Sequence, residues 1–456
     1  TLTDLFELHP VITIPLDHSA LTFTIKSDIP PTPITSVKYR KIGCIDHHEF
    51  ARDLINSNVV QEPVSALDDL VVQYNKDLRA VLDKHAPELC KKVRIRKHAP
   101  WFTEELMVGK RKRRKAERKA MQTGLTIDRD IYKYECRKFK KMCGAAKSMY
   151  YNDKINQCVG DQKSLFKIAN ELLHKQRPVQ LPSYKEPEEI ANRFATYFED
   201  KIKVISATFG PVDSRNSTQP HKKDDRKTHM LDFKTVNEKY LKKTILAGNS
   251  KSCSLDPIPT KLLKKHLEII LPTLLNIVNM SLSAGIFPSP LKKALVTPLL
   301  KKTSLDKEIL KNYRPVSNLA FLGKLIEHVV VQQLTGHKTR NNLYAVYQSA
   351  YREGHSTETA LLRIMNDILL LIDGKKCVML VLLDLSAAFD TLEHSVLLSR
   401  LENENCVSGN VLAWMRSYLH NRTVSVIIEG VQSRPTSLTV GITQGSNVGP
   451  SEYLTY

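Results

Sequence analysis

The sequence predicts a mixed α/β fold, in which a short N-terminal β-hairpin and a basic helical region precede a larger α/β domain. Apolar and polar residues alternate over residues 1–26, which is typical of strands. From about residue 47 to residue 90, apolar residues recur at spacings of three and four, which is typical of amphipathic helices. Residues 377–383 form an uninterrupted apolar run, the pattern of a strand that is buried on both faces.

Composition limits the class of protein. The chain has 456 residues, more than one ordinary domain, and a hydrophobic fraction of 42% is enough to build cores. The net charge of +20 predicts a polyanionic partner, and nucleic acid is favoured over an acidic membrane surface. No stretch is apolar and long enough to span a bilayer, and the N-terminal residues lack a signal-peptide pattern, so no membrane partner is expected.

Eight cysteines are scattered along the chain, and no two of them form a C-x-x-C pair. We therefore expect reduced thiols and an intracellular protein, in the nucleus or the cytoplasm. A zinc site that uses Cys136, Cys143 and a distant histidine is the alternative, although the spacing does not favour it.

Residues 1–28 are predicted to form two strands joined by a polar turn. Two strands cannot bury a core alone. This segment is therefore either an edge of the next domain or the last hairpin of a separate domain.

Residues 40–207 are predicted to be a helical, basic connecting region. One helix is expected to begin at Thr103, whose hydroxyl can cap it, with Glu104 and Glu105 near the positive end of the helix dipole. This helix contains a run of six basic residues, Lys110, Arg111, Lys112, Arg113, Arg114 and Lys115. The run is either a solvated face or a phosphate-binding strip, and the lack of an acidic segment to neutralise it favours nucleic-acid contact. Nuclear targeting by the same residues is compatible with both.

Residues 208–230 are almost without apolar side chains and are predicted to be a flexible linker. The main domain is therefore expected over residues 231–456. Within it, residues 259–280 are predicted as a helix that is interrupted before Pro272. A strand and an amphipathic helix are predicted further on, at residues 294–299 and 321–334.

Asp384 directly follows the apolar run at residues 377–383. A rigid strand that ends in a carboxylate is suited to holding a metal ion. The residues alone leave metal binding and a structural role equally open for Asp384. For Asp390, six positions later, the favoured interpretation is a cap at the start of a helix over residues 391–401.

Several stretches together resemble one known family. Residues 383–391 (LDLSAAFDT) closely resemble the first palm motif of reverse transcriptases from non-LTR retrotransposons (LINEs), particularly the jockey-like branch. Other stretches are similar to this family in the same order: 99–103 (APWFT), 194–202, 254–260 (SLDPIPT), 296–302 (VTPLLKK), 312–319 (NYRPVSNL), 348–360 and 441–446 (GITQGS). The resemblance implies an RNA-directed DNA polymerase, with an incomplete fingers–palm fold over residues 231–456.

The resemblance also accounts for the first segment. Residues 16–19 (LDHS) look like the last active-site motif of an endonuclease of the exonuclease–endonuclease–phosphatase family, with Leu16 in place of the usual serine. Residues 1–28 would then be the remnant hairpin of an α/β-sandwich endonuclease, with Asp17 and His18 from its active site.

The resemblance implies a role for each matching residue. Asp384 is implied to be catalytic and to bind both ions of a two-magnesium site, which is incomplete here. Arg352 is a further candidate for nucleic-acid contact. The nucleotide-binding candidates are Lys301 or Lys302 and Arg314 at the triphosphate, Phe389 beneath the sugar, and Gln444 and Gly445 beside the base. The implied partners are an RNA template, a DNA target or primer, and deoxynucleoside triphosphates.

The sequence departs from the family near its C-terminal end. Thr443 replaces a proline, and Asn447 and Glu452 lie in a continuation that is mostly apolar in the family. The paired-aspartate motif and the thumb would follow Tyr456, and one carboxylate cannot hold two magnesium ions. We therefore expect this chain not to polymerise, although its intact parent would perform target-primed reverse transcription. The alternatives are a domesticated nucleic-acid-binding protein without catalysis and a decayed, non-functional copy.

Overall fold

The computed structural model describes residues 6–9, 22–25, 34–94, 99–158, 161–172, 181–208, 228–302, 304–384 and 387–456. The chain divides into two compact units. The first unit contains residues 1–40 and 88–177, and the second contains residues 41–87 and 178–456. These units do not follow the predicted domain boundaries, because two helical segments predicted in the connecting region belong to the same unit as the C-terminal domain. Most of the predicted linker lies outside the described residues.

The first unit contains two antiparallel strand pairs. Strand β1 (Phe6–His9) pairs with β2 (Thr22–Ile25), and β3 (Ile34–Tyr39) pairs with β4 (Leu89–Arg94). A pair of antiparallel strands in the first segment is therefore confirmed, although its first strand lies at Phe6–His9 and not at the apolar residues 11–14. The apolar residues 11–14 lie outside the described residues, as do Asp17 and His18.

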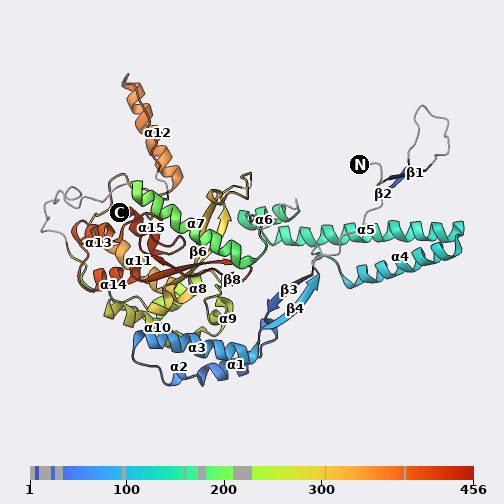
Figure 1. Ribbon diagram of the computed structural model, residues 1–456, viewed down its shortest axis with the longest axis horizontal. Coiled ribbons are helices and arrows are strands. Elements are labelled where there is room, and N and C mark those ends of the chain that lie inside the picture. Colours follow the sequence, from blue (N-terminus) through green and yellow to red (C-terminus); the bar gives the residue numbers. More distant parts are fainter. Residues whose placement is uncertain are drawn as a thin grey trace. The chain divides into compact units, whose positions relative to one another are not determined.

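A long helical hairpin makes up most of the first unit. Helices α4 (Glu104–Thr123) and α5 (Thr126–Asn156) run antiparallel, and the shorter α6 (Gln162–Leu172) follows them (Figure 1). Gly124 ends α4 in the left-handed conformation, with a φ of 67° that suits glycine. Thr103 occupies the N-cap position of α4 as predicted, but its side chain makes no capping hydrogen bond.

The second unit is a mixed α/β structure. Its helices are α1 (His47–Ile55), α2 (Asn58–Gln61), α3 (Leu67–His85), α7 (Pro187–Thr208), α8 (Glu238–Ala247), α9 (Thr260–Lys265), α10 (Leu267–Ala284), α11 (Phe321–Arg340), α12 (Thr357–Asp373), α13 (His394–Asn403), α14 (Gly409–Leu419) and α15 (Val448–Thr455). Its strands are β5 (Lys293–Leu300), β6 (Tyr313–Asn318), β7 (Arg422–Ile428), β8 (Val431–Gln432) and β9 (Thr436–Leu438). The helices expected between residues 47 and 90, the strand near residue 295 and the helix from Phe321 are all confirmed.

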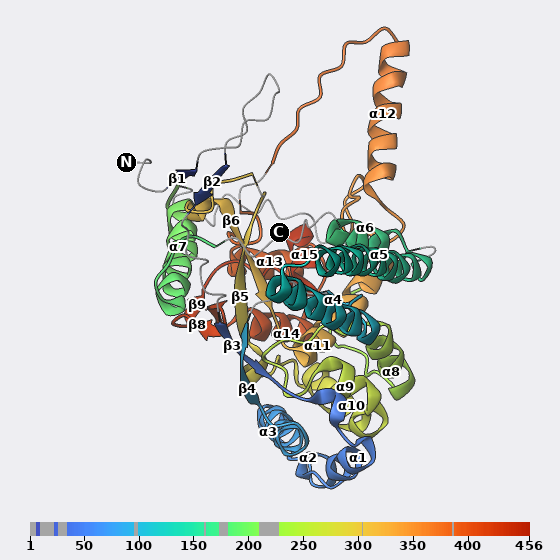
Figure 2. The ribbon, with the colours of Figure 1, turned by 90° about the vertical axis from the view of Figure 1, so that its right-hand side faces the viewer.

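One mixed sheet organises the second unit. Its strand order is β6-β5-β7-β8, and β9 also pairs with β7. Strand β5 is antiparallel to β6 and parallel to β7, and Figure 2 shows β5 and β6 side by side. Helix α7 packs against this sheet, where the buried Phe194 ring meets the Tyr313 ring edge-on at 4.9 Å.

The main core lies around α10 and α14. The rings of Trp414 and Tyr418 stack with centroids 5.3 Å apart, and Phe287 meets each of them edge-on. Among the described residues, α10 is the one helix long and apolar enough to cross a membrane, and 50% of it is buried within the structure. A helix in the core of a globular domain has the same composition.

The predicted interruption of the helix over residues 259–280 is present, but Pro272 is not its cause. The helical segment is instead divided at His266, and Pro272 lies inside α10. Pro272 has no backbone N–H, so α10 lacks one hydrogen bond, the one to the carbonyl of Glu268 in its first turn. The helix continues through the proline without this bond.

The predicted strand over residues 377–383 is also wrong. These residues have no regular secondary structure, and Leu383 is 92% exposed. Helix α12, directly before them, has no buried residue and stands away from its neighbours in both views (Figures 1 and 2). An apolar run indicates a preference for burial, but a strand also needs a partner for its backbone groups. Among the described strands, none pairs with this segment.

Asp256, from the SLDPIPT stretch, ties two distant segments together. One carboxylate oxygen accepts a hydrogen bond from the backbone N–H of Phe321 at 2.6 Å, at the start of α11. The other accepts from the backbone N–H of Cys253 at 2.8 Å. Both N–H groups would otherwise lack a partner in a largely buried place.

We expect Asp256→Ala to lower the free energy of unfolding by about 2 kcal/mol, because two backbone donors lose their acceptor. Asp256→Asn keeps one acceptor oxygen and should lose roughly half as much. Urea denaturation followed by circular dichroism measures both values. Equal stability of the alanine variant and the wild-type chain would contradict this role.

Candidate functional site

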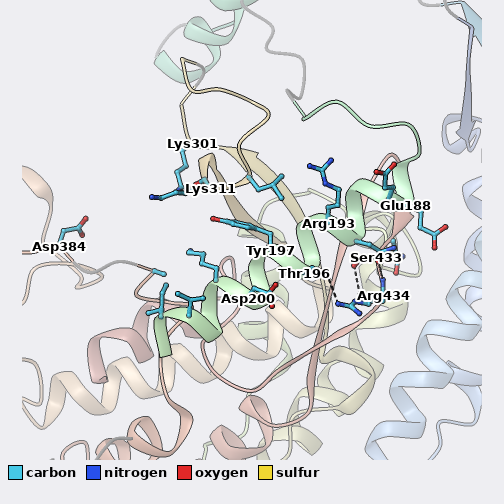
Figure 3. Close-up of a pocket in the computed structure, with 18 residues that line it drawn as sticks. Glu188, Arg193, Thr196, Tyr197, Asp200, Lys301, Lys311, Asp384, Ser433 and Arg434 are labelled. Atoms are coloured by element: carbon cyan, nitrogen blue, oxygen red, sulfur yellow. Dashed lines mark hydrogen bonds between the residues drawn. The ribbon is translucent and has the colours of Figure 1, made fainter. Parts of the chain in front are cut away.

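A broad cleft of about 1640 Å³ lies beside α7 in the second unit (Figure 3). Side chains of α7 line it together with residues around the ends of β5 and β8. Its basic lining residues are Arg193, Lys201, Lys301, Lys311 and Arg434, and its acidic ones are Glu188, Glu189, Asp200 and Asp384. A cleft with this lining can bind an anionic ligand.

Lys301 is the predicted nucleotide-binding residue that lines this cleft. It follows the last residue of β5, and its Nζ donates a hydrogen bond to the backbone carbonyl of Lys311 at 2.8 Å. Burial lowers the pKa of Lys301, and the nearby charges of Lys201, Arg314 and Lys311 lower it further. Lys302 is exposed and does not line the cleft. Lys201, Lys301 and Lys311 line the same cleft, and an anion bound there would relieve the repulsion between their charges.

Arg314 lies on β6, opposite Leu299 in the antiparallel ladder. Its side chain is exposed and does not line the cleft, although it is near enough to Lys301 to affect that pKa. The structure therefore brings together two of the predicted triphosphate contacts, Lys301 and Arg314.

Asp390 is not a helix cap, in contrast to the favoured prediction. Helix α13 begins only at His394, with Glu393 at its N-cap. The carboxylate of Asp390 instead accepts hydrogen bonds from Lys201 Nζ and Gln444 Nε2, each at 3.2 Å. The cap prediction failed because residues 387–390 form a turn, in which Asp390 N–H donates to the Ala387 carbonyl.

Three chain segments meet beside Asp390. The N–H of Ile442 donates to the Phe389 carbonyl at 2.8 Å, and the N–H of Ser317 on β6 donates to the Gln444 carbonyl at 2.8 Å. His394 Nε2 lies 2.8 Å from the carbonyl oxygen of Gly441. These backbone contacts fix Gln444 next to β6 and next to the turn that carries Asp390.

Two glycines make this close approach possible. A Cβ on Gly441 would lie 2.7 Å from the Asp390 carbonyl oxygen, and one on Gly445 would lie 2.6 Å from that of Ser317. Both glycines also have positive φ angles, of 81° and 116°. The predicted importance of Gly445 therefore has a backbone explanation, independent of any ligand.

Phe389 is half-buried, and its ring centroid lies 5.0 Å from that of Tyr453 on α15. It directly precedes Asp390 and so lies at the junction of the three segments. The ring is supported by an aromatic neighbour rather than enclosed in the core.

Asp384 is exposed and lies at the edge of the cleft, away from Lys301 and Lys311 (Figure 3). The part of the chain that the structure describes contains no group of three or more His, Cys, Asp or Glu side chains that could hold a metal ion. The described residues therefore do not fit a two-magnesium site, and Asp390 is already engaged by Lys201 and Gln444.

The remaining predicted contacts lie elsewhere. Arg352 is half-buried, with its guanidinium 5.3 Å from the centre of the Tyr344 ring, and it does not line the cleft. The six basic residues from Lys110 to Lys115 lie on α4 in the first unit.

Lys201 is the site residue to which the sequence assigned no role. The spacing of Lys201 from Phe194 and Phe198 could nevertheless have indicated that it lies on the packed face of its helix. Residues four and three positions apart share one face of a helix, so Lys201 belongs to the face that packs against the sheet. A lysine on such a face needs a partner, which Asp390 provides.

The glycine at 441 gives a controlled test. Gly430 has nearly the same φ, 85° against 81°, but nothing lies within 4 Å of a Cβ built there. Gly430→Ala should therefore cost about 1 kcal/mol from backbone strain alone. Gly441→Ala should cost roughly 2 kcal/mol more, because its Cβ also collides with main-chain oxygens. Thermal unfolding of both variants checks this, and equal losses would show that the junction can relax.

Comparisons with known proteins agree with this geometry. The family model described as reverse transcriptase (RNA-dependent DNA polymerase) matches residues 300–456, which include β6 and Asp390. A probable RNA-directed DNA polymerase from transposon BS of Drosophila melanogaster is 26% identical over 362 residues, which cover 76% of this chain and 39% of that protein. The RNA-directed DNA polymerase from mobile element jockey of the same species is 29% identical over 177 residues, covering 39% of this chain and 19% of the relative.

The chain thus spans well under half the length of these relatives. The matched segment contains the three stretches that meet at Asp390, and both relatives are named as probable or established RNA-directed DNA polymerases of a transposon or mobile element. Residues 300–456 thus match the reverse transcriptase family, and the chain is similar to the RNA-directed DNA polymerases of LINE-type, non-LTR retrotransposons.

Proposed function

We propose that the chain is the nucleotide-binding part of an RNA-directed DNA polymerase, whose parent copies element RNA from a DNA primer at its target. The observation that carries this proposal is the group of Lys201, Lys301, Lys311 and Arg314, in or beside one cleft. Phosphate chains are bound by such groups, since several cationic donors share the negative charge. Gln444 and Gly445, held against β6, would lie beside the incoming base.

The family assigns magnesium ions to the polymerase reaction, where they would supply charge neutralisation at the transferred phosphate. Asp384 is proposed as a metal ligand and catalytic carboxylate on the motif resemblance alone, because the described residues around it do not form a metal site. The RNA template, the DNA primer and deoxynucleoside triphosphates are proposed as partners of the parent polymerase.

The N-terminal segment is proposed to be the tail of an endonuclease domain. The β1–β2 pairing supports a two-stranded end of such a domain, and Asp17 and His18 lie between these strands in the sequence. None of the eight cysteines, all of which lie in the described part of the chain, forms a disulfide, which agrees with a proposed location inside the cell, in the nucleus or the cytoplasm.

The nucleotide site can be tested directly. We expect the double variant Lys301→Gln/Arg314→Gln to bind a fluorescent deoxyadenosine triphosphate analogue at least about tenfold more weakly, because two charged donors are removed. Fluorescence anisotropy of the intact chain measures this affinity. Lys307→Gln is the control, since Lys307 lies in the same connection between β5 and β6 but does not line the cleft. An equal loss in the control would argue against a specific site.

A non-catalytic binding function is supported by helix α4. Arg111, Lys112, Arg114 and Lys115 are exposed on it. The other two residues of the basic run have contacts within the hairpin: Lys110 lies over the Phe102 ring at 5.7 Å, and Arg113 over the Phe139 ring at 5.8 Å. We propose that the four exposed residues contact nucleic-acid phosphates.

We expect replacement of these four residues by Gln to weaken binding of a single-stranded RNA 20-mer. The slope of log K against log salt should fall by roughly 0.7 for each phosphate that the variant no longer neutralises. Thermal stability should hardly change, because glutamine is a good helix former. The control variant Lys110→Gln/Arg113→Gln removes charges that are turned to aromatic rings and should change the slope less. An unchanged slope in the fourfold variant would identify the run as a solvated face.

A further inference from the structure

Helix α7 precedes the segment that the reverse transcriptase family model matches, yet it lines the cleft of that segment. Its rotation is fixed by packing. Ile190, Ala191 and Phe194 are buried against the sheet, in a cluster with Tyr313 and Val426. The positions that α7 presents to the cleft therefore follow from core packing, and they are not free to turn away.

Lys201 lies one turn beyond Phe198 on α7 and lines two cavities. One is the large cleft, shared with Lys301 and Lys311. The other, of about 570 Å³, contains Asp390 and Gln444 in its lining. The Lys201 side chain is 31% exposed and that of Asp390 is 13% exposed, so their ion pair of 3.2 Å is sheltered from bulk water.

Lys203, two residues further on, has different surroundings. Its side chain is 65% exposed and pairs with Glu199 at 2.7 Å on the same helix. It does not line the large cleft, although it does line the smaller cavity with Asp390 and Gln444. An exposed pair of this kind contributes little and restrains its lysine weakly. Lys203 therefore offers a matched control on the same helix.

We propose that α7 forms an additional wall of the nucleotide site, with Lys201 as a direct ligand of the phosphate chain and Asp390 as the residue that positions it. This inference rests on the proposed nucleotide-binding function and adds a segment and two residues to it. Asp390 holds Lys201 and Gln444 at once, so it sets the phosphate end of the site relative to the base end.

The charges favour a compact polyphosphate. Lys201, Lys301 and Lys311 line the large cleft, Arg314 lies beside it, and only Lys201 among them pairs with Asp390. Four other carboxylates line the cleft: Asp200 lies 3.9 Å from Lys203, Asp384 is at the edge, and Glu188 and Glu189 lie in the first turn of α7. The basic side chains lie around Lys301, in or beside one cleft. This arrangement suits the closely spaced negative charges of a triphosphate better than the more widely spaced phosphates of a nucleic-acid backbone.

The experiment measures binding of a fluorescent deoxyadenosine triphosphate analogue to the intact chain, with inorganic tripolyphosphate as competitor. Lys201→Gln should weaken binding about tenfold, because one charged hydrogen bond to phosphate is removed. Lys201→Arg should stay within about threefold of the wild-type chain, since a guanidinium can hold both Asp390 and a phosphate. Lys203→Gln should leave the affinity unchanged. Tripolyphosphate should compete with the analogue for the wild-type chain and compete less well for Lys201→Gln.

The contrary outcomes are distinct. Equal affinities of Lys201→Gln and the wild-type chain, with binding still reduced in Lys301→Gln/Arg314→Gln, would overturn the role of α7 and keep the nucleotide site. Failure of every form to bind the analogue would overturn the nucleotide site itself. A loss of single-stranded RNA affinity in Lys201→Gln, with unchanged analogue binding, would assign the lysine to a nucleic-acid backbone instead. Circular dichroism and thermal unfolding of each variant separate these outcomes from loss of fold.

Discussion

The geometry of the site depends on one constraint, the close backbone contact between the segments around Ser317, Phe389 and Gly441. Main-chain hydrogen bonds join the Gln444 loop to β6 on one side and to the Phe389 turn on the other. Side chains at Gly441 or Gly445 would collide with carbonyl oxygens across these gaps. Because the backbones touch, the side chains that leave them are placed within hydrogen-bonding distance. The Asp390–Gln444 contact is a direct result, and the position of Lys201 depends on it in turn.

Behind this junction lies a set of buried charged groups. Glu327 on α11 is fully buried, and its carboxylate accepts from Tyr418 Oη at 3.1 Å and from the Asn447 N–H at 2.7 Å. Burial raises the pKa of Glu327, while the charge of Arg422 opposes that rise. Asn447 is one of the residues that depart from the family pattern, and here its backbone anchors the end of the Gln444 loop to the core. Asn447, a polar residue where the family has mostly apolar ones, is thus held by a hydrogen bond from its backbone.

A second departure, Glu452 on α15, is accommodated less completely. It is fully buried, and neither carboxylate oxygen has a hydrogen-bond partner among the described residues. Burial raises the pKa of Glu452, and the positive charge of Lys338 on α11 opposes the rise. Lys338 is itself buried and donates to Thr455 Oγ1 at 2.6 Å. Attraction between two buried charges offsets part of their desolvation, so each group makes the other tolerable.

The sequence by itself determined the local elements and the family that the chain resembles. Periodicity of three and four located the helices from residue 47 and from Phe321, and ordered motifs indicated the similarity to LINE-type reverse transcriptases. It also located the basic run on one helix, although not which of its residues have partners. These properties depend on residues close together in the chain, where spacing alone fixes which side chains share a face.

Only the tertiary structure decided what depends on distant contacts. Asp390 read alone suggested a helix cap, but its partner Lys201 is 189 residues away. The apolar run at residues 377–383 read as a buried strand, but burial requires a neighbour that a single strand cannot specify. Helix α7 joined the site because Phe194 packs on Tyr313, a contact that no local pattern encodes. In each case the deciding interaction joins segments whose approach is set by the path of the whole chain.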